Sequence, residues 1–401
     1  MTSKRTGHSG TPLLSLRTKP LPPHPDPTAQ RFGKTRRPFG DPVAIAKNAP
    51  YFIPPPPTNL VNLNMPMSTI LPDEASVSET AGKLVFHSVG DTGGIHGDDV
   101  EIAISNAMEA QIDTTKTDGS QPAFLYLLGD VIYYNGVSTL YNAQFYEPYK
   151  YYPRAIFAIP GNHDGDIRTR ANDPVDHEPS LTGFMQNFCD TAPHNIYQYR
   201  TTMTQPYVYW TFDTPLATII GLYSNVEGSL DARSTNEQQT WFEQQMKNAS
   251  PDKALIVTVH HPPYSLDASH GGTPDIGIAI DRAIQAASGR APDAVLSGHV
   301  HNYQRFERTL GGNKIPYIVA GAGGYADTAT LLHKLQSGTT NLKLPFQTTL
   351  PDVKLMSFNE SEPGFQRVTV DSTTLTFEYY TVPFGGAAVS RFDSIQVKWK
   401  S

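Results

Sequence analysis

The sequence predicts an α/β fold in which two packed mixed β-sheets are flanked by helices, a four-layer α/β/β/α arrangement. From Lys83 onwards, short apolar runs alternate with helical segments, which is typical of a parallel sheet with crossover helices. Towards the C-terminus the runs follow each other with strict polar and apolar alternation, which predicts antiparallel strands. A chain of 401 residues is long enough to bury both sheets, so we expect one domain over residues 81–401.

Residues 1–80 differ in composition from the rest of the chain. Five prolines lie between residues 20 and 27, and Pro54–Pro57 form a second run. Proline fixes φ and lacks a backbone donor, so we expect a Pro-rich, partly disordered arm up to residue 80. The basic residues of this arm leave a targeting or nucleic-acid-binding tail as a minor alternative.

The first sheet is predicted from segments that alternate between strand and helix. They are the strand Lys83–Val89, a helix from Asp98 or Asp99 to Ile112, the strand Ala123–Leu128, a helix over Leu140–Tyr149 and the strand Ala155–Ile159. Right-handed crossovers between such strands give a parallel sheet.

A second group of segments predicts the other sheet and its helices. Its strands are expected at Tyr207–Asp213, Ala217–Leu222, Ala254–Val259, Ala294–Ser297 and Pro316–Ala320, with helices near Thr235–Asn248 and Ile276–Ser288. In the tail, Gly364–Val370, Thr374–Thr381 and Ser394–Lys398 alternate like antiparallel strands. No internal repeat is found, which favours one continuous domain.

Composition limits the function classes. A net charge of -7 does not favour a nucleic-acid-binding surface. Cys189 is the single cysteine, which excludes an intrachain disulfide and a cysteine-based zinc site. No apolar run approaches the about 20 residues of a membrane helix. We therefore expect a cytoplasmic protein by default, with an exported form left open and the oligomeric state not indicated.

Polar residues follow five of the predicted strands directly. These motifs are Asp91-Thr92-Gly93, Gly129-Asp130-Val131-Ile132-Tyr133, Gly161-Asn162-His163-Asp164, His260-His261 and Gly298-His299-Val300-His301. Ligands of open α/β sheets gather at the carboxyl ends of strands, and alternation places His299 and His301 on one side. Each motif alone has an ordinary structural explanation as a turn or helix cap. Together they offer oxygen and nitrogen donors for two metal ions, without the thiolates that favour soft metals.

These five blocks resemble the metallophosphoesterase superfamily with the calcineurin-like fold, and in detail the purple acid phosphatases. That family shows Asp-x-Gly, Gly-Asp-x-x-Tyr, Gly-Asn-His-Asp/Glu, Val-x-x-His and Gly-His-x-His in this order, and the resemblance covers roughly residues 83–325. It implies that one metal ion is held by Asp91, Tyr133 and His301, that Asp130 bridges the two ions, and that Asn162, His260 and His299 complete the second site.

Gly93 departs from the broader superfamily, where many members have a histidine at this position. The resemblance implies that Tyr133 replaces the missing ligand. Because a free phenol has a pKa of about 10, phenolate ligation favours a strongly Lewis-acidic ion. We expect Fe(III) in the Tyr133 site and Zn, Mn or Fe(II) in the second site.

The implied activity is hydrolysis of phosphate monoesters by a metal-bound hydroxide that attacks phosphorus in line. His163 resembles the family's histidine that contacts the phosphate and assists the leaving group, as a general acid does. A small-molecule or protein phosphate ester is the expected partner. Two alternatives stay open: a phosphodiesterase acting on nucleotides or lipid headgroups, and a non-catalytic metal- or phosphate-binding protein with this fold.

Further substrate contacts are expected near the motifs and in the long polar segment 165–205, because long irregular loops beside a site are often functional. The candidates are His261, His177 and His194. His261 adjoins the proposed ligand His260, so it either contacts substrate or packs in the turn with Pro262.

Overall fold

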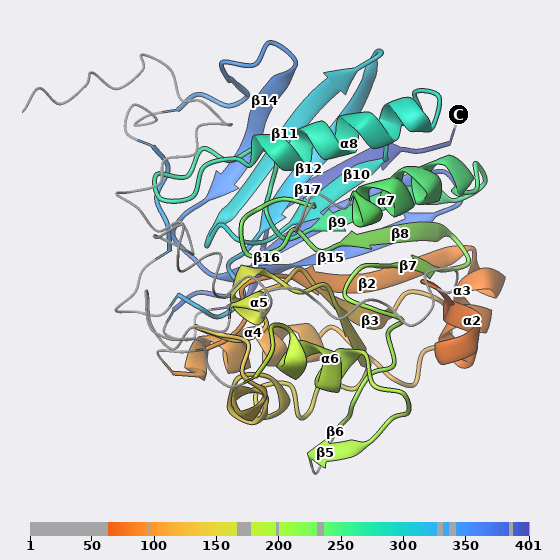
Figure 1. Cartoon of the computed structure of the whole chain (residues 1–401), viewed down its shortest axis with the longest axis vertical. Coiled ribbons are helices and arrows are strands. Elements are labelled where there is room, and N and C mark those ends of the chain that lie inside the picture. Colours follow the sequence, from red (N-terminus) through yellow and green to blue (C-terminus); the bar gives the residue numbers. More distant parts are fainter. Residues whose placement is uncertain are drawn as a thin grey trace, which may run out of the picture.

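The computed structural model describes residues 63–94, 97–166, 178–197, 200–230, 236–326, 332–336, 342–384 and 388–400. Two large mixed sheets lie face to face, with helices on the outer side of each (Figure 1). This arrangement confirms the predicted fold class.

The six-stranded sheet carries the first three polar motifs. Its strand order is β17 (Ser390–Lys398), β16 (Thr374–Thr381), β15 (Gly364–Asp371), β2 (Lys83–Val89), β3 (Pro122–Leu127) and β4 (Ala155–Ala158). The pairs β2–β3 and β3–β4 are parallel, whereas β15, β16 and β17 run antiparallel to their neighbours.

The nine-stranded sheet carries the two histidine motifs. Its order is β1 (Asn64–Pro66), β7 (Trp210–Asp213), β8 (Ala217–Leu222), β9 (Ala254–Val259), β10 (Ala294–Ser297), β12 (Asn313–Ala320), β11 (Tyr303–Leu310), β14 (Val353–Asn359) and β13 (Phe346–Gln347). The strands from β8 through β9 and β10 to β12 pair in parallel. A separate hairpin is formed by β5 (Asn195–Tyr197) and β6 (Arg200–Thr201).

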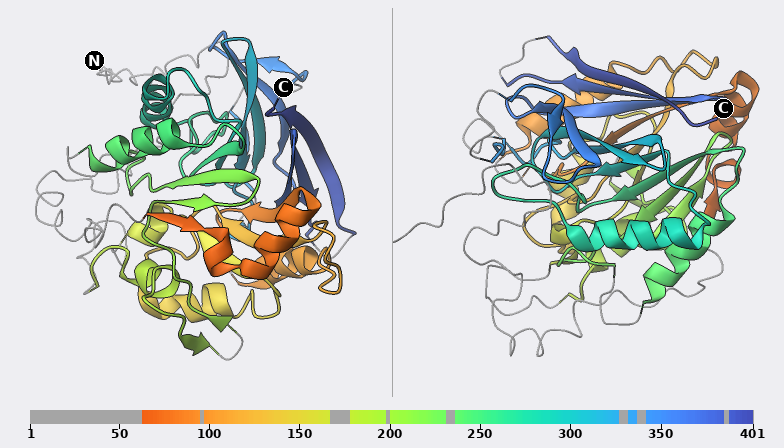
Figure 2. Two further views of the ribbon diagram at one scale, coloured as in Figure 1. Left: turned by 90° about the vertical axis from the view of Figure 1, so that its right-hand side faces the viewer. Right: turned by 90° about the horizontal axis from the view of Figure 1, so that it is seen from above.

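Helices cover both outer faces. They are α2 (Met67–Ile70), α3 (Pro72–Ala81), α4 (Asp99–Glu109), α5 (Asn162–Gly165), α6 (Thr182–Phe188), α7 (Glu237–Asn248) and α8 (Pro274–Ala286). In Figure 1 and in the turned views of Figure 2, α7 and α8 lie on the nine-stranded sheet, while α4 and α6 lie on the far side of the six-stranded sheet.

Alternating residues of the central strands fill the core between the two sheets. On β3, Phe124 and Tyr126 point inwards, and Leu125 and Leu127 belong to the outer core. Phe124 contacts Phe212 of the opposite sheet, with ring centroids 5.1 Å apart. Because both faces of each central strand are buried, the strands appear in sequence as continuous apolar runs.

Residues 64–81 contradict the expectation of an irregular arm up to residue 80. β1 is an edge strand that pairs in parallel with β7, and α3 follows with Pro72 in its first turn. The first N–H groups of a helix have no acceptor within the helix, so proline is tolerated there. Proline is also tolerated on edge strands. Residues 1–62 lie outside the described part of the chain.

Three further differences concern element type. The helix predicted over Leu140–Tyr149 is a 3-10 turn, Ser138–Leu140, followed by a π-helical turn, Asn142–Tyr146. β11 and β14 were not predicted. Charged residues interrupt both sequences, and pairing with neighbouring strands rather than local pattern stabilises them.

Candidate metal centre

The five polar motifs meet at the carboxyl ends of the parallel strands of both sheets. Asp91 follows β2, Asp130 follows β3, and Asn162 opens α5 just after β4. On the other sheet, His260 follows β9, and the pair His299 and His301 follows β10; this pair makes up the last of the motifs. Packing of the two sheets therefore brings residues distant in sequence to one place.

A first set of donors consists of Asp91, Tyr133 and His301. The Tyr133 hydroxyl donates to Asp91 Oδ1 at 3.1 Å and lies 3.3 Å from His301 Nε2. His301 Nε2 is 3.4 Å from the same carboxylate oxygen. Donors on a tetrahedral ion with bonds of about 2.1 Å are separated by about 3.4 Å, so these three atoms have the spacing of metal ligands.

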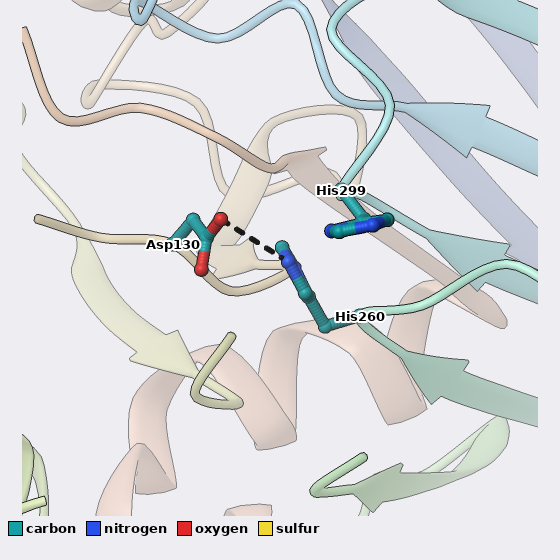
Figure 3. A group of neighbouring side chains, drawn as sticks. All are labelled: Asp130, His260 and His299. Atoms are coloured by element: carbon teal, nitrogen blue, oxygen red, sulfur yellow. Dashed lines mark ion pairs between the residues drawn. The ribbon is translucent and has the colours of Figure 1, made fainter. Parts of the chain in front are cut away.

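A second set of donors consists of Asp130, Asn162, His260 and His299. Asn162 Oδ1 lies 3.1 Å from His260 Nε2 and 2.9 Å from His299 Nδ1. His260 Nε2 is also 3.2 Å from Asp130 Oδ2. Figure 3 shows Asp130 and the two histidines converging from the two sheets on one space.

Backbone contacts fix the orientation of the second set. His260 Nδ1 lies 2.8 Å from the carbonyl oxygen of Leu128, which can only accept, so Nδ1 carries the proton and Nε2 presents its lone pair. The His299 amide donates to Asp91 Oδ2 at 2.7 Å and links the two donor sets. Such supporting bonds are typical of metal ligands.

The backbone at the ligands adopts an uncommon conformation. Asp91, Asp130 and His299 have φ angles of 59°, 52° and 69°. Left-handed conformations at non-glycine residues are costly and concentrate at functional sites. A Cβ at Gly161 would lie 2.1 Å from Asp130 Oδ1, so glycine is required where the chain passes behind this carboxylate.

Burial of so many ionisable groups changes their pKa values. Burial raises the pKa of Asp91 to about 8, and the neighbouring Asp130 adds to this rise. Burial alone would lower the pKa of His260, but the Asp130 and Asp91 carboxylates raise it to about 9. The negative charge of the two aspartates therefore favours a bound positive charge, which a proton or a metal cation can supply.

The donor types fit two cations. The seven residues offer two carboxylates, a phenol, an amide oxygen and three imidazoles, a set suited to borderline and hard metal ions. Gly93 could not be a histidine in this structure, because a Cβ there would lie 2.7 Å from Gln144 Oε1 and 2.9 Å from Ile132 Cα. Gln144 and the backbone of Val131 and Ile132 therefore close the space that a side chain at residue 93 would need.

His163 lies at the edge of the donor sets without belonging to them. Its ring is 4.6 Å from that of Tyr133, measured between centroids. Its Nδ1 lies 2.8 Å from the carbonyl oxygen of Tyr134 and so carries a proton, and its amide donates to Asp130 Oδ1 at 2.8 Å. His163 Nε2 is thus the nitrogen that a substrate can meet.

The three predicted substrate contacts have different positions. His261 is buried against His299, with ring centroids 4.1 Å apart, and its Nδ1 lies 2.7 Å from Ser224 Oγ. His194 is not brought to the other predicted residues: it precedes the β5–β6 hairpin and pairs with Asp190 at 2.6 Å. His177 lies outside the described residues.

Two residues that support the ligands were not predicted. The Asp164 carboxylate accepts from the amides of Val131 and Gly161 at 3.1 and 2.8 Å, so it holds the second and third motifs together. Gln144 exchanges two 2.8 Å hydrogen bonds with the backbone of Tyr133. Asp164 stands inside a motif and could have been noticed, whereas nothing in the sequence marks Gln144.

Three further aromatic residues lie beside the ligands. The Tyr325 ring is tilted against the rings of both Tyr133 and His301, at centroid distances of 4.5 and 4.2 Å. It follows the glycines after β12, so the strand-end pattern could have revealed it. His270 and His333 lie next to His299 and His301. His270, near Gly271 and Gly272, is an undecided candidate contact from the sequence, whereas nothing there marks His333.

A scan against protein-family models matches residues 88–303, more than half of the chain, to the calcineurin-like phosphoesterase family. The chain belongs to this family. The matched region begins in β2 and ends at the first residue of β11, so it contains all five motifs. Both donor sets therefore lie within the region that matches the calcineurin-like phosphoesterase family.

Curated relatives of this calcineurin-like phosphoesterase include acid phosphatases. Purple acid phosphatase 21 from Arabidopsis thaliana is 27% identical over 171 residues, which cover 41% of this chain and 34% of that protein. Tartrate-resistant acid phosphatase type 5 from Oryctolagus cuniculus is 26% identical over 263 residues, covering 62% of this chain and 75% of that enzyme. The chain thus spans only about a third of the length of the plant relative.

A third relative has a different description. A probable glycerophosphodiester phosphodiesterase from Arcobacter nitrofigilis is 29% identical over 145 residues, or 36% of this chain and 49% of that protein. The sequence similarity therefore extends both to acid phosphatases and to a probable glycerophosphodiester phosphodiesterase.

Among solved structures, the purple acid phosphatase PPD1 from yellow lupin (Lupinus luteus) seeds superposes with a TM-score of 0.56 at 18% identity. The match covers 79% of this chain and 54% of the lupin enzyme. This likeness supports the fold of the calcineurin-like phosphoesterases. Within the described ranges, no helix of this family member has the length and apolar character needed to cross a membrane.

Proposed function

We propose that the protein is a dinuclear metal-dependent phosphomonoesterase of the purple acid phosphatase type. The observation that carries this proposal is the convergence of two donor sets with ligand-like spacing, and of His163 beside them, at the carboxyl ends of both sheets. Family membership and the acid phosphatase relatives support the same activity.

In this proposal Asp91, Tyr133 and His301 hold one cation, and Asn162, His260 and His299 hold the other. Asp130, whose Oδ2 lies 3.2 Å from His260 Nε2, would be the carboxylate that both cations share. The bound cations would supply Lewis-acid chemistry, which polarises the phosphoryl group and neutralises charge that develops on it.

The protein's own residues then orient the substrate and move a proton. The carbonyl of Tyr134 fixes the His163 ring so that Nε2 is free to meet the ester oxygen. A protonated His163 donates to the departing oxygen, and such general-acid help is worth about 10²–10⁴-fold in rate.

For the metals, we propose Fe(III) with Asp91, Tyr133 and His301, and Zn, Mn or Fe(II) in the second set. Two anionic oxygen donors together with one imidazole favour a hard trivalent ion. The iron-loaded protein should show a visible tyrosinate-to-iron charge-transfer band that disappears in Tyr133→Phe. Persistence of the band in this variant would show that another group binds the iron.

The test of the function compares matched aryl monoester and diester phosphates, hydrolysed by metal-reconstituted protein between about pH 4 and 9. Faster turnover of the monoester is the expected result. Hydrolysis of neither substrate by protein with two bound ions would reject catalysis and favour a metal- or phosphate-binding role.

The second candidate is a phosphodiesterase acting on nucleotides or lipid headgroups. The Arcobacter relative, described as a probable glycerophosphodiester phosphodiesterase, is the observation that favours it. Faster turnover of the diester in the paired assay would support this candidate and reject the monoesterase.

A further inference from the structure

A separate cluster of metal-binding side chains lies beside the two donor sets. Asp267 and His270 belong to the segment after β9, and His333 belongs to the segment after β12. The Nδ1 atoms of the two histidines are 3.3 Å apart, and they lie 3.9 and 3.6 Å from Asp267 Oδ1. This spacing is close to that of the seven proposed ligands.

The backbone holds the two segments of this cluster together. Asp267 and Leu335 form an antiparallel bridge. The Ala268 amide donates to the Lys334 carbonyl at 2.9 Å, and the Gln336 amide donates to Leu266 at 2.8 Å. The three donors are therefore already in position.

The Asp267 carboxylate is fixed from several directions. It is fully buried, and its Oδ1 accepts the amides of Ser269 and His270 at 2.7 and 2.5 Å. Asn302 Nδ2 lies 3.3 Å from Oδ2 and also donates to the His333 carbonyl at 3.0 Å. Ligating carboxylates are commonly hydrogen-bonded in this way.

The charge of Asp267 lacks a permanent cation in the described part of the chain. Its ion pairs there are those with His270 and His333, which neutralise it only when protonated. Buried carboxylates are stabilised by a paired cation or a metal. One carboxylate and two imidazoles form the donor set of an open zinc site, with bonds of about 2.0–2.2 Å.

We propose that Asp267, His270 and His333 form a third cation site that takes Zn²⁺ or a similar divalent transition metal. The site adjoins the dinuclear centre: the His270 and His299 rings are 4.7 Å apart, and the His333 and His301 rings are 4.4 Å apart, between centroids. A cation here adds positive charge beside His299 and His301, two of the ligands in the proposed function.

A simpler arrangement has the two imidazoles share a proton between their Nδ1 atoms while Asp267 only orients them. The two rings are nearly parallel, with an interplanar angle of 7° and centroids 4.7 Å apart. An N–H···N hydrogen bond prefers in-plane geometry, from which stacked rings depart; an imidazole also binds a metal in its own plane, so binding of one ion by both requires one ring to turn about its side-chain torsions. This arrangement predicts no third metal equivalent, so metal counting separates the two.

The experiment titrates metal-depleted full-length protein with Zn²⁺ and measures bound zinc per chain. Wild type should bind three equivalents, and Asp267→Asn and His333→Ala should each bind two. Asn at 267 keeps an oxygen for the Ser269 and His270 amides but removes the charge. Two equivalents in the wild type and in both variants would overturn the proposal.

The matched control is the Asp–His pair Asp190 and His194, which is 2.6 Å apart and lies in the hairpin region. Asp190→Asn and His194→Ala should each retain three equivalents, and a loss there would mean that the third ion binds elsewhere. If the cluster variants fail to fold, the wild-type protein is titrated with Co²⁺ instead. Saturation at three equivalents supports the third site, and saturation at two rejects it. Because these measurements count metal, they stand apart from the hydrolysis assay of the proposed function.

Discussion

Among single residues, Asp130 has an uncommon backbone conformation, is buried and contacts two histidine residues. It has a φ angle of 52°, is 1% exposed, and contacts both His260 and the amide of His163. Burial alone would raise the pKa of its carboxyl, but His260 and His163 hold that pKa well below the usual range. Asp130 is therefore an ionised carboxylate within the second donor set.

Asp130→Asn should lower metal content and hydrolysis together, because the amide removes the anionic bridge. Mutation of a residue that only supports a ligand typically lowers metal affinity by about 10–100-fold. We expect the change at Asp130 itself to lower it by at least about 100-fold. Elemental analysis and aryl phosphate turnover measure both effects. Asp252→Asn, at an exposed carboxylate, is the control, and normal turnover in Asp130→Asn would reject the bridge.

His163→Ala should keep both ions and lose about 10²–10⁴-fold in turnover, because the side chain moves a proton but holds no cation. The loss should be largest for esters with poor leaving groups, which depend most on the acid. Rates for a series of aryl phosphates of graded acidity, together with metal content, check this. A fall in metal content would instead place His163 among the ligands.

At the scale of elements, each motif is a turn between a buried strand and the next segment, and close approach of these turns limits their sequence. The turn at Gly161 opens α5 and passes behind Asp130. Its neighbour Asp164 bonds back to the turn after β3, so the two turns form one unit.

Gly161→Ala should disturb this unit, since the new Cβ would lie 2.1 Å from Asp130 Oδ1 and 2.3 Å from its amide nitrogen. We expect metal affinity to drop and stability to fall by about 1–3 kcal/mol, as for overpacked sites. Gly277→Ala in α8 is the control, because its Cβ meets nothing closer than 3.8 Å. Equal metal binding in the two variants would contradict the close approach.

His87 in β2 predicts a pH dependence of stability away from the metal centre. Burial lowers its pKa to about 3, against 6.5 in the unfolded chain. Between these values the unfolded state binds one more proton, so stability falls as pH drops, by up to about 1.4 kcal/mol per pH unit. His87→Gln should flatten the unfolding free energy between pH 6.5 and 4, and an unchanged slope would contradict this.

Much of the fold at this scale could be predicted from the sequence. β8 and β9 were predicted with their observed bounds, because both faces are buried and the apolar runs end sharply. β11 was missed because Arg305 and Arg308 lie within it, and their charges are neutralised by Asp393, Asp281 and Asp352 from distant segments. Ion pairs with distant segments cannot be inferred from the few residues on either side of each arginine.

The candidate site could be predicted as a set of strand ends, but its surroundings could not. The motifs mark themselves by glycine and polar residues after apolar runs. His333, by contrast, lies well beyond the end of β12, and the bridge from Asp267 to Leu335 together with hydrogen bonds to His301 and Asn302 brings it to the site. His194 shows the opposite case, a histidine in a polar loop that bonds within its own hairpin region.

At the scale of the whole molecule, the aromatic layer between the sheets holds them in register. Phe124 is fully buried and contacts Phe86 and Phe157 of its own sheet as well as Phe212 of the other. Tyr303 and Tyr379 stack across the same layer at 3.9 Å between centroids. Each proposed cation draws ligands from both sheets, so this layer also sets the distances within the centre.

Phe124→Ala should cost about 3–5 kcal/mol of folding free energy, because it leaves a cavity in this layer. Metal affinity should fall as well, although the residue touches no ligand. Denaturant unfolding and zinc titration measure the two effects. Phe392→Ala, at a ring that is 46% exposed, should change stability by less than about 0.5 kcal/mol. Unaltered metal affinity in a destabilised Phe124→Ala protein would show that the aromatic layer does not set the distances between the metal ligands.

Since each donor set includes residues from both sheets, a bound ion is also a cross-link between them. Ligand binding to the folded state alone adds to its stability in proportion to the logarithm of the ligand concentration. Bound metal would then compensate for mutations that weaken packing between the sheets. A variant with weakened packing would fold where metal is plentiful and misfold where metal is scarce.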